Sequence, residues 1–318
     1  MSELKLLTPY RRETLTVLNR APPVKAVSPA AQHRKVLLHW RDVAPQRLGQ
    51  HFLASAAWRE RIARLVLPAT PPDGEISANE GGSERRDLWI EIGAGHGEMT
   101  SLLARQAGRL IAIELDPHLL SRLREQTARL PNVEVIAADV LAVDLAALIG
   151  PQRFRAYGNL PYYITSPIVQ RLLAQADRLE AAFLVIQLEV AARMTARPGS
   201  RDYGYFSAFT QFYSKPEILL RIPPGAFQPP PEVSSALVAL HLPGERSQLD
   251  ITDDARFLKF LKACFAQKRK TLRNNLRSLM PQERATAVLR GCGIALNARA
   301  EELGLAQFAR LFAAAERS

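Results

Sequence analysis

The sequence predicts an α/β fold, with a mostly parallel seven-stranded sheet followed by a small all-helical C-terminal domain. Short apolar segments typical of buried strands alternate with helical patterns between residues 88 and 241. A glycine-rich turn, Gly93-Ala94-Gly95-His96-Gly97, directly follows the first of these segments. Beyond residue 254 the pattern is helical. These observations indicate a doubly wound sheet, a fold that binds ligands at the carboxyl ends of its parallel strands.

Composition limits the class of protein. The chain has 318 residues, of which 47% are hydrophobic, enough for one main domain with a large core and a smaller second domain. No apolar run reaches the roughly 20 residues of a membrane span. The two cysteines, Cys264 and Cys292, provide neither a disulfide framework nor a metal site, so we expect a metal-free protein in a reducing cytoplasm. A net charge of +11 indicates a polyanionic partner, RNA or DNA.

Two segments are expected to lie outside the main folded body. Residues 1–45 are basic and interrupted by prolines, so we expect a flexible extension; an arm that binds a nucleic-acid backbone is the alternative. An amphipathic helix is predicted over residues 54–67, and residues 68–87, rich in Pro, Gly, Ser and acidic residues, are predicted to be a surface insertion. The main domain is expected over residues 46–243 and the helical domain over residues 244–318.

The predicted strands carry polar residues where they end. Their ranges are 88–92, 110–115, 133–137, 154–157, 182–188, 215–222 and 235–241. Glu114 ends the second strand, where an acidic side chain suits a ribose diol, and Asp139 follows the third, where it can bind an adenine amino group. Either carboxylate can instead cap a helix. The spacing Gly93-x-Gly95-x-Gly97 departs from the Gly-x-Gly-x-x-Gly pattern, which weakens the interpretation as a dinucleotide site.

The fourth strand leads into Gly158-Asn159-Leu160-Pro161-Tyr162. Pro161 fixes φ and has no N–H group, which leaves the neighbouring carbonyls free to accept hydrogen bonds. The Asn159 side chain and the Leu160 carbonyl can accept both hydrogens of an exocyclic amino group, and the Tyr162 ring can stack on a planar base. Methylation of an adenine N6 requires such acceptors, because its lone pair is delocalised into the ring and is a poor nucleophile. An ordinary turn after a buried strand is the alternative.

Phe227 lies in a proline-rich loop over residues 223–231. Its ring can stack on the far face of a flipped base, or it can fill the core beneath the loop, and its position in the sequence favours neither. A linker is predicted after the last strand, over residues 243–254, from its composition.

The segment between residues 256 and 290 carries ten Lys or Arg and one acid, Glu283. A solvated helix face usually mixes charges of both signs, so this segment is expected to face phosphates. A basic helix is predicted over residues 265–276. The predicted RNA-binding residues are Lys268, Arg269, Lys270, Arg273 and Arg277.

Taken together, the motifs resemble those of the small-subunit rRNA adenine N6-dimethyltransferases, which are relatives of the erythromycin-resistance rRNA methylases. The resemblance runs from about residue 47 to the C-terminus. The segments that carry it are Gly49 to Leu53, Glu91 to Gly95, Ile113 to Asp116, Ala138 to Val140, Gly158 to Tyr162, Phe227 to Val233 and Phe265 to Leu276. Neither the N-terminal extension nor the insertion at 68–87 has a counterpart in the family pattern.

The resemblance implies a Rossmann-like class I methyltransferase that binds S-adenosylmethionine, needs no metal and acts as a monomer. It implies methyl transfer to N6 of two adjacent adenosines near the 3′ end of 16S rRNA, within the small ribosomal subunit or its precursor, and a role in ribosome biogenesis. The implied cofactor-binding residues are His51, Leu53, Gly93, Gly95, Glu114, Asp139 and Asn159. The predicted catalytic residues are Asn159, Leu160, Pro161, Tyr162 and Phe227.

Three rival functions share parts of this pattern. A resistance-type methylase that acts on 23S rRNA lies in the same class, and the long basic C-terminal segment argues against it. An assembly factor or transcription factor that binds RNA without turnover is disfavoured by the intact Glu114, Asp139 and Asn159. A DNA adenine methylase usually needs a sequence-reading domain, which this chain does not reveal.

Overall fold

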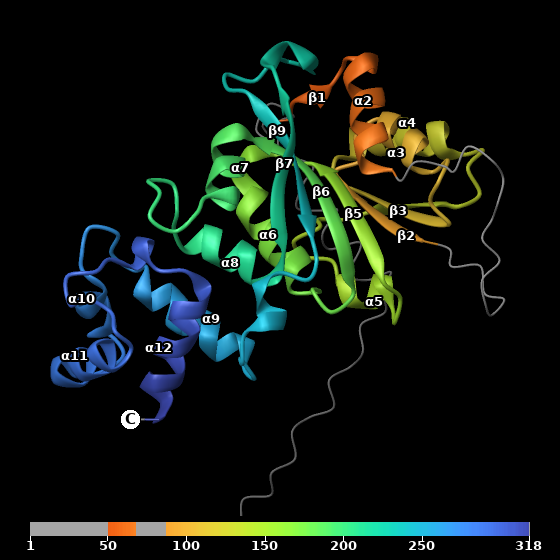
Figure 1. The fold of residues 1–318 in the computed structure, drawn as a ribbon. Coiled ribbons are helices and arrows are strands. Elements are labelled where there is room, and N and C mark those ends of the chain that lie inside the picture. The colour runs from red at the N-terminus through yellow and green to blue at the C-terminus, as the bar shows by residue number, and fades with distance from the viewer. Residues whose placement is uncertain (1–49, 68–86, 318) are drawn as a thin grey trace, which may run out of the picture. The chain divides into compact units, whose positions relative to one another are not determined.

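The computed structural model describes residues 50–67 and 87–317, all of which belong to one compact unit (Figure 1). The predictions for residues 1–45, and for the insertion at 68–87 up to residue 86, lie outside the described residues. Within the described residues, no helix combines the length and apolar character that crossing a bilayer requires.

A seven-stranded sheet forms the centre of the fold, as predicted. Its order is β4-β3-β2-β5-β6-β9-β7, and the five strands from β4 to β6 are parallel while β9 runs antiparallel to both of its neighbours. The strands are β2 (Leu88–Ile92), β3 (Arg109–Glu114), β4 (Val133–Ala137), β5 (Phe154–Asn159), β6 (Leu179–Gln187), β7 (Lys215–Ile222) and β9 (Ser235–His241). A separate pair, β1 (Phe52–Leu53) and β8 (Phe227–Gln228), is antiparallel.

Helices cover both faces of the sheet, which explains why its central strands are apolar without alternation. Helices α6 (Thr165–Leu173) and α7 (Leu188–Thr195) pack on one face, and α2 (Ala56–Val66) and α3 (Glu98–Leu103) pack on the other (Figure 1). Strand β2 shows the division, because Ile90 belongs to the first core and Trp89 to the second. The remaining helices of this part are α4 (Pro117–Thr127), α5 (Leu145–Ile149) and α8 (Tyr205–Tyr213).

The part of the chain beyond residue 254 is helical, as predicted. It contains α9 (Asp254–Cys264), α10 (Leu272–Leu276), α11 (Gln282–Gly291) and α12 (Leu305–Arg317). Their shared core includes side chains of α8, where the rings of Phe212 and Phe257 lie 5.1 Å apart between centroids. This core crosses the boundary predicted at residues 243–244, and the division into two domains stays a prediction.

The prediction of a basic helix over residues 265–276 is wrong. Residues 265–270 form a turn, and only the five residues of α10 that follow are helical. The Thr271 hydroxyl caps α10 by accepting from the Asn274 N–H at 3.4 Å. The Asn275 amide donates to the carbonyls of Cys264 at 2.7 Å and Gln267 at 3.2 Å. Because these side chains bond to the backbone, they favour the turn over a continuous helix.

Candidate active site

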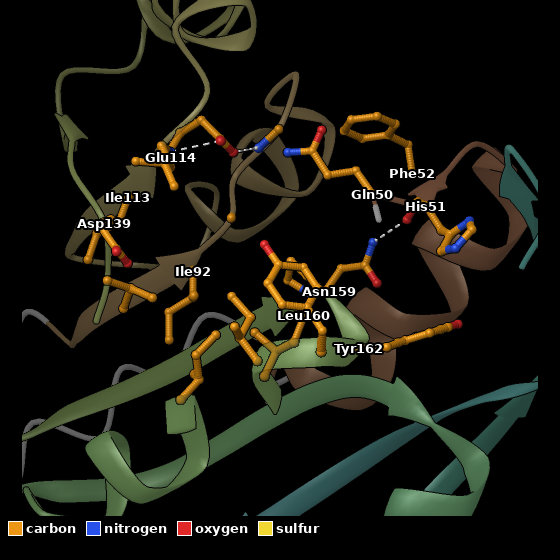
Figure 2. Close-up of a pocket in the computed structure, with 18 of the residues that line it drawn as sticks. Gln50, His51, Phe52, Ile92, Ile113, Glu114, Asp139, Asn159, Leu160 and Tyr162 are labelled. Carbon is orange, nitrogen blue, oxygen red and sulfur yellow. Dashed lines mark hydrogen bonds between the residues drawn. The ribbon is translucent and has the colours of Figure 1, made fainter. Parts of the chain in front are cut away.

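A pocket opens at the carboxyl ends of β2, β3, β4 and β5, the edge at which the sequence predicts ligand binding (Figure 2). Its empty volume, open solvent included, is about 810 Å³. Most of the predicted cofactor and catalytic residues line it, namely His51, Gly93, Gly95, Glu114, Asp139, Asn159, Leu160, Pro161 and Tyr162.

The glycine turn gives the pocket a floor of backbone atoms. Gly93 and Gly95 adopt φ values of 70° and 59°, a left-handed conformation that other residues rarely adopt. A Cβ at Gly95 would also lie 3.4 Å from the Phe52 ring, so the turn and the segment around β1 approach each other closely. The turn therefore leaves room for a ligand to lie against the main chain.

Glu114 is buried at the end of β3 and is held by the backbone around it. Its Oε2 accepts from the Gly95 N–H at 2.8 Å, and its Oε1 accepts from the N–H groups of Leu115 and Asp116, both at 2.8 Å. Burial raises the pKa of Glu114 above its ordinary value, and these three N–H groups lower it. A carboxylate offers about four acceptor positions, so at least one remains for a ligand hydroxyl.

Asp139 follows β4 and enters the pocket from the neighbouring strand end (Figure 2). Its Oδ1 accepts from the Leu141 N–H at 2.8 Å, which fixes the side chain. Within residues 50–67 and 87–317, no donor contacts Oδ2. Asp139 thus presents one oriented acceptor to the pocket.

Asn159 ends β5 and is oriented by a contact from far away in the sequence. Its Nδ2 donates to the His51 carbonyl at 2.8 Å, which identifies the other amide atom, Oδ1, as an available acceptor (Figure 2). The Leu160 N–H bonds to the Val185 carbonyl at 3.0 Å, and no donor among the described residues contacts the Leu160 carbonyl. Two acceptors therefore lie next to each other at this strand end.

Tyr162 is half-buried and is held from two sides. Its hydroxyl lies 2.7 Å from Ser235 Oγ, and its ring centroid lies 5.5 Å from that of His51, with the planes inclined by 33°. The His51 Nδ1 in turn lies 2.8 Å from the Pro229 carbonyl oxygen. Burial raises the pKa of Tyr162, so its hydroxyl stays protonated at neutral pH. The ring is thus fixed beside Asn159 without a charge.

Two of the predicted site residues do not line the pocket. Phe227 is 3% exposed and Leu53 is 7% exposed, and the two are partners in the β1–β8 pair. Both side chains belong to the core that contains α2 and α3. The Phe227 ring therefore fills the core in this structure, one of the two placements that its sequence position left open, and its stacking on a flipped base stays a prediction. The Leu53 side chain is likewise part of the core, and its carbonyl accepts from Arg59 at 2.7 Å.

Two residues, one in the pocket and one buried behind it in β2, were given no role by the sequence analysis. Tyr163 lines the pocket and is 60% exposed. In the sequence, only its position directly after Tyr162 indicates a place in the site. Glu91 lies buried in β2, in register with Tyr157 and near Thr100 of α3. Burial raises the pKa of Glu91 to about 8, and its Oε2 has no hydrogen-bond partner among the described residues. Glu91 is therefore a neutral acid at pH 7.

The predicted RNA-binding residues do not line the pocket; they lie on the turn before α10, on α10 and directly after it. Lys268, Arg269, Lys270 and Arg277 are exposed, whereas Arg273 is half-buried. The Lys268 ammonium donates to the Arg201 carbonyl at 2.8 Å, so this cation already has a partner within the chain.

Similarity to known proteins agrees with this geometry. A family model described as ribosomal RNA adenine dimethylase matches residues 43–317. The protein called ribosomal RNA small subunit methyltransferase A in Acidobacterium capsulatum is 45% identical over 268 residues, which cover 84% of this chain and 89% of that protein. The protein of the same name in Rubrobacter xylanophilus is 42% identical, with coverage of 84% and 93%.

Two solved structures have the same fold. The crystal structure of the 23S rRNA methyltransferase ErmE is 28% identical, with a TM-score of 0.59 over 83% of this chain and 99% of that chain. A dimethyladenosine transferase from Plasmodium falciparum is 23% identical, with a TM-score of 0.66 over 82% and 96%, and this likeness shows the fold. With the family model spanning all of the described residues, the chain belongs to the ribosomal RNA adenine dimethylase family.

Proposed function

We propose that this protein uses S-adenosylmethionine to dimethylate N6 of two adjacent adenosines near the 3′ end of 16S rRNA, within the small ribosomal subunit or its precursor. The observation that carries the proposal is the pair of acceptors at the end of β5, Asn159 Oδ1 and the Leu160 carbonyl, in one pocket with the carboxylates of Glu114 and Asp139. The small-subunit names of the relatives support the choice of rRNA.

The pocket fits the proposed cofactor. The backbone floor at Gly93 and Gly95 admits close approach, Glu114 has an acceptor position for a ribose hydroxyl, and Asp139 Oδ2 can accept from an adenine amino group. When bound, S-adenosylmethionine supplies an electrophilic methyl group on a sulfonium. The chain's own residues then have to hold the target nitrogen in line with that methyl group.

Asn159 and Leu160 perform that orientation. The amino group of the target adenine donates one N–H to Asn159 Oδ1 and the other to the Leu160 carbonyl, which favours the tetrahedral, positively charged nitrogen formed as the new N–C bond forms. The His51 carbonyl holds the Asn159 amide in the required orientation. The protonated amine then loses its proton to water, so no general base is needed. Tyr162, fixed by Ser235, supplies the stacking face for the base.

Radiolabelled methyl transfer to 30S subunits, 50S subunits and DNA, offered separately, tests the substrate. We expect label in the 16S rRNA of 30S subunits and in neither of the other two. Label in 50S subunits would support a resistance-type 23S rRNA methylase instead. Binding of 30S subunits without any label, by a protein that binds S-adenosylmethionine, would identify an RNA-binding assembly factor.

A further inference from the structure

We propose that the turn over residues 197–202 and the turn over residues 268–270 form one surface that binds the phosphate backbone of the RNA substrate. The inference rests on the proposed function and adds two residues, Arg197 and Arg201, to the RNA-binding set. These residues come from the segment between α7 and α8, far in the sequence from the basic C-terminal segment.

One hydrogen bond joins the two turns directly, and a second ties the 197–202 turn to the segment before α12. Lys268 Nζ donates to the Arg201 carbonyl at 2.8 Å, and the Gly199 N–H donates to the Glu301 carbonyl at 2.7 Å. The side chain of Lys268 therefore acts as a brace between the two turns. The cations that stay available for phosphates are Arg197, Arg201, Arg269 and Lys270, all of which are exposed.

Both turns are also fixed from beneath. The Gln211 amide donates to the carbonyls of Met194 at 2.9 Å and Ala196 at 2.8 Å, which ties the end of α7 to α8. The buried Tyr203 ring packs edge-on against Phe265, with centroids 6.0 Å apart. A surface that is ordered before binding loses less conformational entropy when it meets a rigid partner such as an RNA helix.

The charge and polarity of the surface fit phosphates. None of the four exposed cations forms an ion pair within residues 50–67 and 87–317, and Asp202 is the only acid in either turn. Neither turn exposes a large apolar side chain among those described. A protein partner usually meets an apolar centre with a polar rim, whereas repeated unpaired cations suit a polyanion.

The test compares three double variants for binding to purified 30S subunits as salt rises from about 50 to about 200 mM. The first is Arg197→Gln with Arg201→Gln, and the second is Arg269→Gln with Lys270→Gln. The third, Arg122→Gln with Arg124→Gln, is a control that removes two exposed charges from α4, at the other end of the sheet. Thermal unfolding checks that each variant is folded.

For the first and second variants we expect a log–log salt slope that is flatter by about one to two units, because each phosphate contact contributes somewhat under one unit. Over a fourfold rise in salt, the fold-reduction in 30S affinity is then about ten times smaller for each of these variants than for the parent. The control keeps the parent slope, and S-adenosylmethionine affinity is unchanged in all three variants.

The outcomes separate this inference from the proposed function. A flatter slope for Arg269→Gln with Lys270→Gln, together with a parent slope for Arg197→Gln with Arg201→Gln, overturns the shared surface and leaves the proposed function standing. If Arg197→Gln with Arg201→Gln binds 30S subunits more weakly but keeps the parent salt slope, the two arginines contact something other than phosphates. This outcome also overturns the inference. A parent that neither binds nor methylates 30S subunits refutes the proposed function itself.

Discussion

Replacing Glu91 by glutamine is expected to remove a large pH dependence from the stability of the fold. Glu91 is 2% exposed between the sheet and α3, and burial raises its pKa from 4.5 to about 8. The folded state therefore keeps a proton on this carboxyl at pH values where the unfolded chain has already released it. Because the folded state binds more protons, the free energy of unfolding falls as pH rises from 4.5 to about 8.

The magnitude follows from the width of that interval. Each pH unit contributes about 1.4 kcal/mol, so the full interval contributes about 5 kcal/mol, which is a large share of the stability of a typical domain. Glutamine has nearly the shape of the protonated acid and does not titrate. The contribution of this position should therefore be independent of pH in the variant.

Urea unfolding of the parent and of Glu91→Gln, from about pH 5 to about pH 9, measures the effect. The difference between the two proteins cancels the titration of groups that do not interact with Glu91. We expect the variant to gain on the parent by about 1.4 kcal/mol per pH unit up to about pH 8, and the difference to level off above it. A difference that stays constant from pH 5 to pH 8 would show that Glu91 is ionised in the folded state and would refute the reasoning.

Three further predictions concern the pocket and the fold. Asn159→Ala should lower the single-turnover methylation rate by about 10²-fold or more, because an acceptor aimed at developing charge is lost, and should change 30S binding little. A normal rate with weaker cofactor binding would instead show that Asn159 is a cofactor ligand only. Glu114→Ala should weaken S-adenosylmethionine binding in calorimetry by about 1–3 kcal/mol, and unchanged affinity would contradict the ribose assignment. Gly244→Ala should lower the midpoint of thermal unfolding strongly, because its Cβ would lie 2.3 Å from the Ser214 backbone nitrogen. Gly225→Ala, whose Cβ meets nothing within 4 Å, is the matched control, and equal midpoints would refute the steric argument.

The sequence alone was sufficient for the sheet and for the edge at which the site lies. The strands that end at Glu114 and Asn159 are predictable because buried parallel strands are largely apolar, and the strand that Asp139 follows because its β-branched residues alternate with a polar one. The carboxyl ends of parallel strands meet at one edge, so polar residues after successive strands converge whatever the details of packing. The prediction that Glu114, Asp139 and Asn159 share a pocket needed no more than this rule.

The tertiary structure decided how individual side chains are used, because those contacts join segments far apart in the chain. The orientation of the Asn159 amide depends on the His51 carbonyl, 108 residues away, and the role of Lys268 depends on Arg201, 67 residues away. Phe227 occupies the core because β8 pairs with β1, which no local pattern reveals. Periodicity and turn residues report the local chain, whereas pairing between distant segments is set by the packing of the whole fold.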